Sequence, residues 1–135
     1  MKMIVSKRAV NVQQMPEQVT AANERNILQY LQKKCAETER PRFVLDCSPV
    51  RDMDTATIQL LLSCLEEVMK CNGDVRLAAL RPEAGATLRL SGVSRLFETY
   101  PSTEAAVQSF QKRPSSMAPF EIDSESLDLN SGLAA

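Results

Sequence analysis

The residues best placed to do chemistry are Asp54 and Thr55, at the point where a predicted strand gives way to a predicted helix. The strand covers residues 43–48, the turn runs from Pro49 to Met53, and the helix begins at Asp54. In open α/β sheets, ligand and partner sites gather beyond the carboxyl ends of the strands. A hydroxyl in the first turn of a helix also lies among backbone N–H groups that favour negative charge. The pattern indicates that a phosphate group could be added and held at Thr55.

The same two residues also have a purely structural interpretation. Asp is a preferred N-cap residue, and Thr is common at helix starts. Asp54 could therefore cap the helix and do nothing more, or it could help to bind a divalent ion or orient an incoming phosphoryl group. Spacing alone leaves these possibilities open.

Three more polar residues, Asp46, Ser48 and Asp52, fall near the same turn. Ser48 could contact a partner or a phosphate, although a turn-capping role fits it as well. Asp52 either adds charge near Thr55 or is a solvated loop residue. Together with Asp54, the two aspartates offer the hard oxygen ligands that Mg²⁺ prefers. Because nothing in the spacing shows that they converge, we predict no metal site.

The composition argues against an enzyme. The chain contains no histidine, which removes the commonest general base and the commonest metal ligand. It also has no Gly-rich phosphate loop and no recognisable nucleophile–base pair. The four cysteines form no CxxC pair, and Cys64 and Cys71, seven residues apart on one helix, are best interpreted as small packed residues. We expect no cofactor.

The elements that position this turn alternate between strand and helix. The apolar run at residues 43–48 predicts a strand that is covered on both faces, and residues 75–80 predict the next strand. Helices are predicted from Thr20 to about residue 36, from Asp54 to about residue 71, from Pro82, and from Ser102. Strands that alternate with helices imply parallel pairing through right-handed crossovers, and hence an α/β layer fold. Weaker signals predict short strands at Ile4-Val5 and at residues 9–12, in a hairpin arrangement.

Length and charge indicate one domain followed by a tail. The 135 residues suffice for a single core, and the formal net charge is −1. We assign residues 1–113 to the domain and residues 114–135, which carry four acidic residues and no Lys or Arg, to a flexible acidic tail. Residues 1–113 carry slightly more Lys and Arg than Asp and Glu, and this excess is too small to indicate nucleic-acid binding. No apolar stretch is long enough to span a membrane and no signal peptide is evident, so we expect a cytoplasmic protein without membrane insertion.

Two segments carry a resemblance to a known family. Residues 43–55, FVLDCSPVRDMDT, resemble the strand and turn of STAS domains in anti-sigma factor antagonists, where Asp-x-Ser precedes Asp-Ser-Ser-Gly or Asp-Thr-Ala-Gly at a helix start. Residues 88–102, LRLSGVSRLFETYPS, resemble the family segment Leu-x-Leu-Thr-Gly-Leu-x-x-Leu-Phe. The resemblance covers about residues 4–112. It implies a STAS-like fold, with a mixed β-sheet of four to five strands and helices packed mainly on one face. The composition adds a disordered C-terminal tail.

The resemblance also implies a function. In such antagonists the hydroxyl after the Asp is phosphorylated by an anti-sigma factor with serine/threonine kinase activity, and only the unmodified antagonist binds this kinase. The corresponding residue is Thr55. The partner-binding residues implied by the match lie between Ser48 and Ile58: Ser48, Asp52, Asp54, Thr55, Ala56, Thr57 and Ile58.

One position departs from the family pattern. Thr57 stands where the family has glycine, which keeps the helix start open to a partner. A β-branched side chain there could block a kinase or could supply a second hydroxyl.

Two other functions remain alternatives. STAS domains also serve as non-catalytic subunits of lipid or anion transporters, in which case an ABC transporter ATPase would be the partner. A third possibility is a scaffold in a signalling assembly, which predicts self-association.

Overall fold

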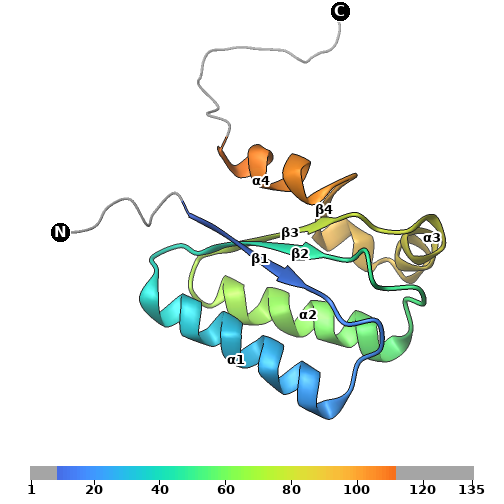
Figure 1. Ribbon diagram of the computed structural model, residues 1–135, viewed down its shortest axis with the longest axis horizontal. Helices are drawn as coiled ribbons and strands as arrows, with labels where there is room; N and C mark the ends of the chain where they lie inside the picture. Colours follow the sequence, from blue (N-terminus) through green and yellow to red (C-terminus); the bar gives the residue numbers. More distant parts are fainter. Residues whose placement is uncertain (1–8, 112–135) are drawn as a thin grey trace, which may run out of the picture.

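The computed structural model describes residues 9–111, which form a four-stranded β-sheet with helices on both faces (Figure 1). The elements follow the chain as β1 (Val10–Gln14), α1 (Ala21–Glu37), β2 (Arg42–Asp46), α2 (Thr55–Met69), β3 (Asp74–Ala78), α3 (Pro82–Ser91), the short 3₁₀ helix η2 (Val93–Leu96), β4 (Glu98–Tyr100) and α4 (Thr103–Gln111). The sheet order is β1-β2-β3-β4, and every neighbouring pair is parallel. The carboxyl ends of all four strands therefore meet at one edge.

The helices form two unequal layers. α1 and α2 lie side by side under one face, α4 covers the other, and α3 lies toward the carboxyl ends of the strands (Figure 1). The larger core cluster joins the sheet to α1, α2 and α3, with Phe43, Leu45 and Leu77 fully buried. A smaller cluster packs Ala106 and Phe110 of α4 against the opposite face. The predicted α/β, STAS-like class is confirmed, with the helices mainly on one face.

Two sequence-based predictions concern residues that the structure does not describe. The strand at Ile4-Val5, and the hairpin in which it would take part, lie outside the described residues, as does the acidic tail of residues 114–135. The strands within residues 9–111 are all parallel, so a mixed sheet would require pairing by a segment outside that range.

Local sequence signals explain where the helices begin and end. Thr20 caps α1 in a reciprocal box with Asn23, at 3.1 and 2.8 Å. Asn72, with φ of 60°, provides the left-handed residue that ends the α2 region. Pro82 occupies the first turn of α3, and Gly92, with φ of 83°, ends it.

The buried face of α2 differs from the predicted one. The helical spacing of the apolar residues predicts a stripe formed by Ile58, Leu61, Leu62, Leu65, Val68 and Met69. The fully buried residues are instead Thr57, Leu60, Leu61, Cys64 and Val68. Met69, which this spacing places in the core, is 56% exposed. Apolar residues surround most of this helix, so periodicity alone does not define which face is buried.

Candidate functional site

The turn between β2 and α2 is held from both ends. The N–H of Ser48 donates to Oδ1 of Asp46 at 3.0 Å, which closes a side-chain turn directly after the strand. The N–H of Val50 donates to the carbonyl of Cys47 at 3.0 Å. Val50 and Met53 are buried, and so they anchor the turn to the core while the residues between them stay exposed.

Asp54 caps α2, as one of the two sequence interpretations proposed. Its Oδ1 accepts two hydrogen bonds from Thr57, from the backbone N–H at 2.9 Å and from Oγ1 at 2.7 Å. The hydroxyl and N–H of Thr57 lower the pKa of Asp54 below its ordinary value, because both donors stabilise the carboxylate. The second carboxylate oxygen receives no hydrogen bond within residues 9–111.

Thr57 is buried rather than part of the exposed surface. Only 2% of the residue is accessible, and its hydroxyl is committed to Asp54. Two residues along an α-helix differ by about 200° in direction, so Thr55 and Thr57 point to nearly opposite sides of α2. The β-branched side chain in place of the family glycine therefore does not cover the Thr55 face.

Thr55 and Ala56 are exposed at the start of α2, while Ile58 is partly buried against the core. Within the part of the chain that the structure describes, the Thr55 hydroxyl has no hydrogen-bond partner. The first backbone N–H groups of a helix lack intrahelical acceptors. An exposed hydroxyl and free N–H donors therefore lie next to each other at this helix start.

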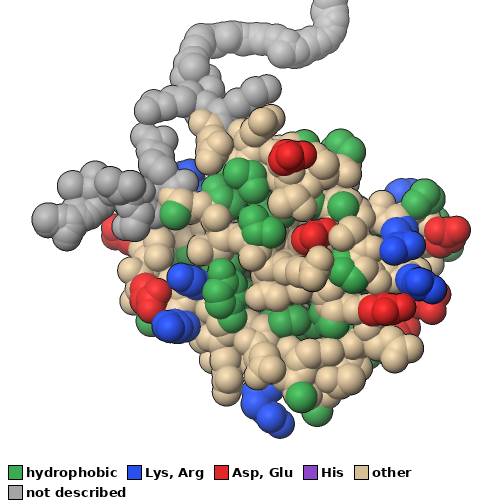
Figure 2. All heavy atoms as spheres, in the orientation of Figure 1, with side chains coloured by type: hydrophobic (Ala, Val, Ile, Leu, Met, Phe, Trp, Pro, Cys, Tyr) green, Lys and Arg blue, Asp and Glu red, His purple; other side chains and the backbone are tan. Residues whose placement is uncertain are grey.

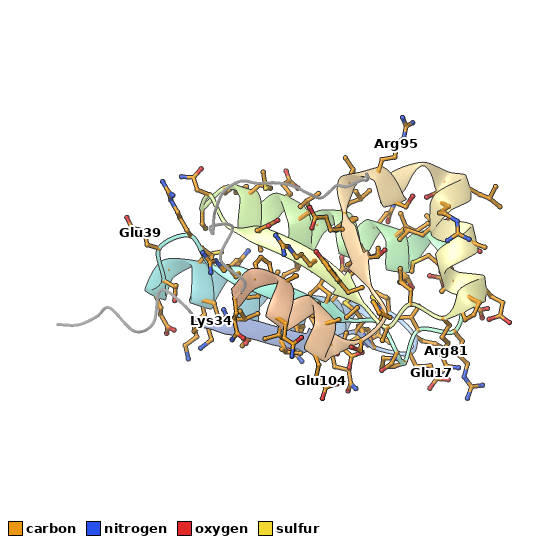
Figure 3. The ribbon with its side chains drawn as sticks, turned by 90° about the horizontal axis from the view of Figure 1, so that it is seen from above. Glu17, Lys34, Glu39, Arg81, Arg95 and Glu104 are labelled. Atoms are coloured by element: carbon orange, nitrogen blue, oxygen red, sulfur yellow. The ribbon has the colours of Figure 1, made fainter. Side chains whose placement is uncertain are left out.

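Residues from other loops contact or flank the turn between β2 and α2. Nε of Arg81, at the start of α3, donates to the carbonyl of Ser48 at 2.8 Å and so ties the β2–α2 turn to the next crossover. Arg51 forms an exposed ion pair with Glu17 at 3.4 Å. Figure 3 shows Arg81 and Glu17 at the same end of the molecule, opposite the end at which Glu39 lies.

Arg81 also lines a cavity of about 480 Å³ together with Arg89 and Tyr100. Sequence reasoning missed the link from Arg81 to Ser48, because nothing in the spacing connects two residues 33 positions apart.

The structure brings most of the predicted site residues to one surface. Ser48, Asp52, Asp54, Thr55 and Ala56 are all exposed along the turn and the start of α2. Among residues 9–111, no three Asp, Glu, Cys or His side chains form a group that could hold a metal ion.

The charges of the described surface are mixed. On the face drawn in Figure 2, Lys and Arg side chains are interspersed with Asp and Glu, and no continuous basic patch appears. No helix between residues 9 and 111 has the length and apolar character needed to cross a membrane.

Comparison with known proteins identifies the family. The model of the STAS domain matches residues 3–106. A search of curated protein sequences gave no significant match.

Solved structures share the fold at low sequence identity. A STAS domain protein described as an anti-sigma-factor antagonist from Planctomyces limnophilus is 14% identical, with 78% of this chain and 93% of that chain covered and a TM-score of 0.65. An anti-sigma factor antagonist from Mycobacterium paratuberculosis is 20% identical, with coverage of 76% and 86% and a TM-score of 0.61. The STAS domain of a SulP transporter from Vibrio cholerae is 16% identical, with coverage of 80% and 85% and a TM-score of 0.65.

Proposed function

Because the chain belongs to the STAS domain family, we propose that it is a non-catalytic regulatory protein that binds an anti-sigma factor with serine/threonine kinase activity and is released when Thr55 is phosphorylated. The observation that carries this proposal is the exposed Thr55 hydroxyl, directly after an Asp54 whose carboxylate is already engaged by Thr57.

The geometry at Thr55 suits modification by a kinase. The hydroxyl has no hydrogen bond to break within residues 9–111, and the bulky neighbour at position 57 is directed into the protein. The hydrogen bonds from Thr57 hold Oδ1 of Asp54 in place, which leaves the other carboxylate oxygen able to orient an incoming phosphoryl donor. A kinase would therefore meet a preorganised helix start.

A phosphate at Thr55 would change the charge of the surface sharply. The exposed carboxylates of Asp52 and Asp54 lie close in sequence on either side of Met53. Phosphorylation adds about −1.5 to −2 charges to this small area. A partner that fits the unmodified surface would then face repulsion and a bulky, hydrated group. The charge change thus supplies a physical reason for release.

We propose that the partner-binding surface consists of Ser48, Asp52, Asp54, Thr55, Ala56 and the exposed part of Ile58. Thr57 supports it from below by fixing Asp54, and it does not contact the partner. The hydrogen bond from Arg81 to the carbonyl of Ser48 ties the Ser48 end of this surface to the start of α3.

The test compares binding by substituted full-length chains. Thr55→Glu should lose at least tenfold in affinity for the kinase captured from the protein's own cells, whereas Thr55→Ala should retain binding. Thr103→Glu is a matched control, because Thr103 also begins a helix directly after a capping residue, Ser102, but on the opposite face of the sheet. Equal binding by Thr55→Glu and Thr55→Ala would exclude the switch.

The same capture experiment addresses the alternatives. Recovery of a transporter ATPase, with no phosphate detected on Thr55 by mass spectrometry, would replace the proposal with a transporter subunit. Recovery of further copies of this chain alone would replace it with a scaffold.

A further inference from the structure

Two thiols from separate helices meet at the end of the molecule opposite the carboxyl ends of the strands. Cys35 lies in the last turn of α1, and Cys71 follows the end of α2. Both thiols donate to the same acceptor, the backbone carbonyl of Glu67, with Sγ–O distances of 3.8 and 3.7 Å. Because both sulfur atoms lie within 4 Å of one carbonyl oxygen, the two thiols occupy the same small region between the helices. They are 36 positions apart in sequence, so only the packing of α1 on α2 brings them together.

The local backbone fixes this arrangement. The N–H groups of Cys71 and Gly73 both donate to the carbonyl of Val68 at 3.0 Å. A Cβ added at Gly73 would collide with the carbonyl oxygen of Pro41 and would lie 2.7 Å from Cγ1 of Val68, so the turn is packed tightly against the start of β2. The backbone of Cys71 is therefore held at a fixed place beside the end of α1.

The other two cysteines differ from this pair in access. Cys47 and Cys64 are fully buried, whereas Cys35 and Cys71 are partly exposed. Burial raises the pKa of both Cys47 and Cys64 to about 12. A dissolved oxidant therefore reaches Cys35 and Cys71 while the buried thiols stay protected.

We propose that Cys35 and Cys71 form an oxidisable dithiol, which a two-electron oxidant such as hydrogen peroxide closes into a disulfide between the C-terminal ends of α1 and α2. The proposal is independent of the function assigned to Thr55. α2 has 15 residues and so spans about 22 Å, which separates the disulfide from the Thr55 surface.

The reaction balances with peroxide as the only co-reactant. Burial and the neighbouring Cys71 thiol raise the pKa of Cys35 to about 12, so Cys35 keeps its proton at neutral pH. The Cys71 sulfur attacks one peroxide oxygen as its S–H proton leaves. The O–O bond breaks, Cys71 becomes a sulfenic acid, and the released hydroxide takes up a proton to form water. Cys35 then attacks the Cys71 sulfur, the S–O bond breaks, the S–S bond forms, and the Cys35 proton leaves with the hydroxyl as a second water.

The disulfide should stabilise the folded chain, because it closes a loop of about 36 residues in the unfolded state. Loop-closure entropy predicts a rise in melting temperature on the order of 10 °C. It should leave partner binding at Thr55 unchanged.

The test treats the reduced, folded full-length chain with hydrogen peroxide and measures its intact mass. The wild type should lose two hydrogen atoms per chain, and tryptic digestion should link the peptide of residues 35–42 to that of residues 71–76. Cys35→Ser should instead accumulate a sulfenic acid at Cys71 that dimedone traps, and Cys71→Ser should form neither product. Cys64→Ala is the matched control, which should still lose two hydrogen atoms.

A second measurement does not depend on oxidation. Phenylarsine oxide, which bridges two neighbouring thiols, should add once to the reduced wild type and not to Cys35→Ser or Cys71→Ser.

Three outcomes of the peroxide experiment would each overturn the proposal. They are linked peptides that contain Cys47 or Cys64, a disulfide between two chains, and free Cys35 and Cys71 after oxidation.

Discussion

The hydroxyl of Thr57 donates to Oδ1 of Asp54 at 2.7 Å, and the N–H of the same residue donates to the same oxygen at 2.9 Å. A buried side chain thereby fixes the orientation of an exposed carboxylate. Glycine at position 57 would supply only the N–H donor. The departure from the family pattern therefore adds a hydrogen bond to the helix cap and leaves the outer face of α2 unobstructed.

Thr57→Val should remove this hydroxyl while keeping the shape of the side chain. We expect the pKa of Asp54 to rise toward its ordinary value and the free energy of unfolding to fall by about 1 kcal/mol. NMR titration of the Asp54 carboxylate and denaturant unfolding measure the two effects. Thr57→Ser is the control, because it keeps the donor and should keep the lowered pKa. An unchanged Asp54 pKa in Thr57→Val would contradict this account.

The Asp54 cap should make stability depend on pH in a definite direction. The pKa of Asp54 is lowered in the folded state from the ordinary 3.8, so the carboxylate stabilises the fold above that pH. This contribution is lost as the pH falls through the folded-state pKa. The amide side chain of the Asp54→Asn variant does not titrate. Below about pH 4, the wild type should therefore lose free energy of unfolding relative to Asp54→Asn. A constant difference from pH 6 to pH 2 would disprove the linkage.

Two glycines should respond in opposite ways to replacement by alanine. Gly73→Ala would bring a methyl group against the Pro41 carbonyl oxygen and to 2.7 Å from Val68, and it should destabilise the fold by about 2 kcal/mol or more. Gly85 lies inside α3, where the new Cβ would approach no atom closer than 3.6 Å. Gly85→Ala should stabilise by about 0.5–1 kcal/mol. Thermal melts of both variants, compared with the wild type, show whether each substitution stabilises or destabilises the fold.

Arg76 should be more sensitive than other arginines to replacement by lysine. Its guanidinium lies 4.0 Å from the centre of the Phe110 ring, and Nη1 donates to Oγ of Ser109 at 2.6 Å. It also pairs with Asp74 at 3.4 Å. Lysine cannot reproduce the planar stacking or this set of donors. Arg76→Lys should therefore lower the free energy of unfolding by about 1–2 kcal/mol. Arg89→Lys, at an exposed position, should change stability by less than about 0.5 kcal/mol. Equal losses of stability in Arg76→Lys and Arg89→Lys would show that stacking of Arg76 on Phe110 does not stabilise the fold.

Local signals allowed much of the fold to be predicted. The strand predicted at residues 43–48 is observed as Arg42–Asp46. The caps at Thr20 and Asp54 and the helix start at Pro82 were confirmed. All of these features depend on neighbouring residues. The sequence also predicts a brief extended piece at Glu98-Thr99-Tyr100, which the structure shows as β4. These features are set by backbone preferences within a few positions, which a sequence displays directly.

Other features depend on contacts that a sequence does not display. The burial of Thr57 and the exposure of Met69 follow from how α2 rotates against the sheet and α1. Leu90, an apolar residue of the family-like segment 88–102, is 89% exposed on α3. The meeting of Cys35 with Cys71, and of Arg81 with Ser48, joins residues that are more than 30 positions apart. Only the assembled crossovers bring such residues together.

The parallel register also sets the order in which the domain can form. Val10 pairs with Arg42, and Arg42 pairs with Asp74, so each central ladder joins residues 32 positions apart. No hairpin within residues 9–111 can start the sheet locally, because every described strand pair is parallel. During synthesis, β1 must wait for the whole of α1 and β2 before it can form its parallel ladder with β2. Closing such long loops slows folding relative to helical bundles of similar size. The helices α1 and α2 are therefore the elements able to form first and hold the strands near one another while the sheet assembles.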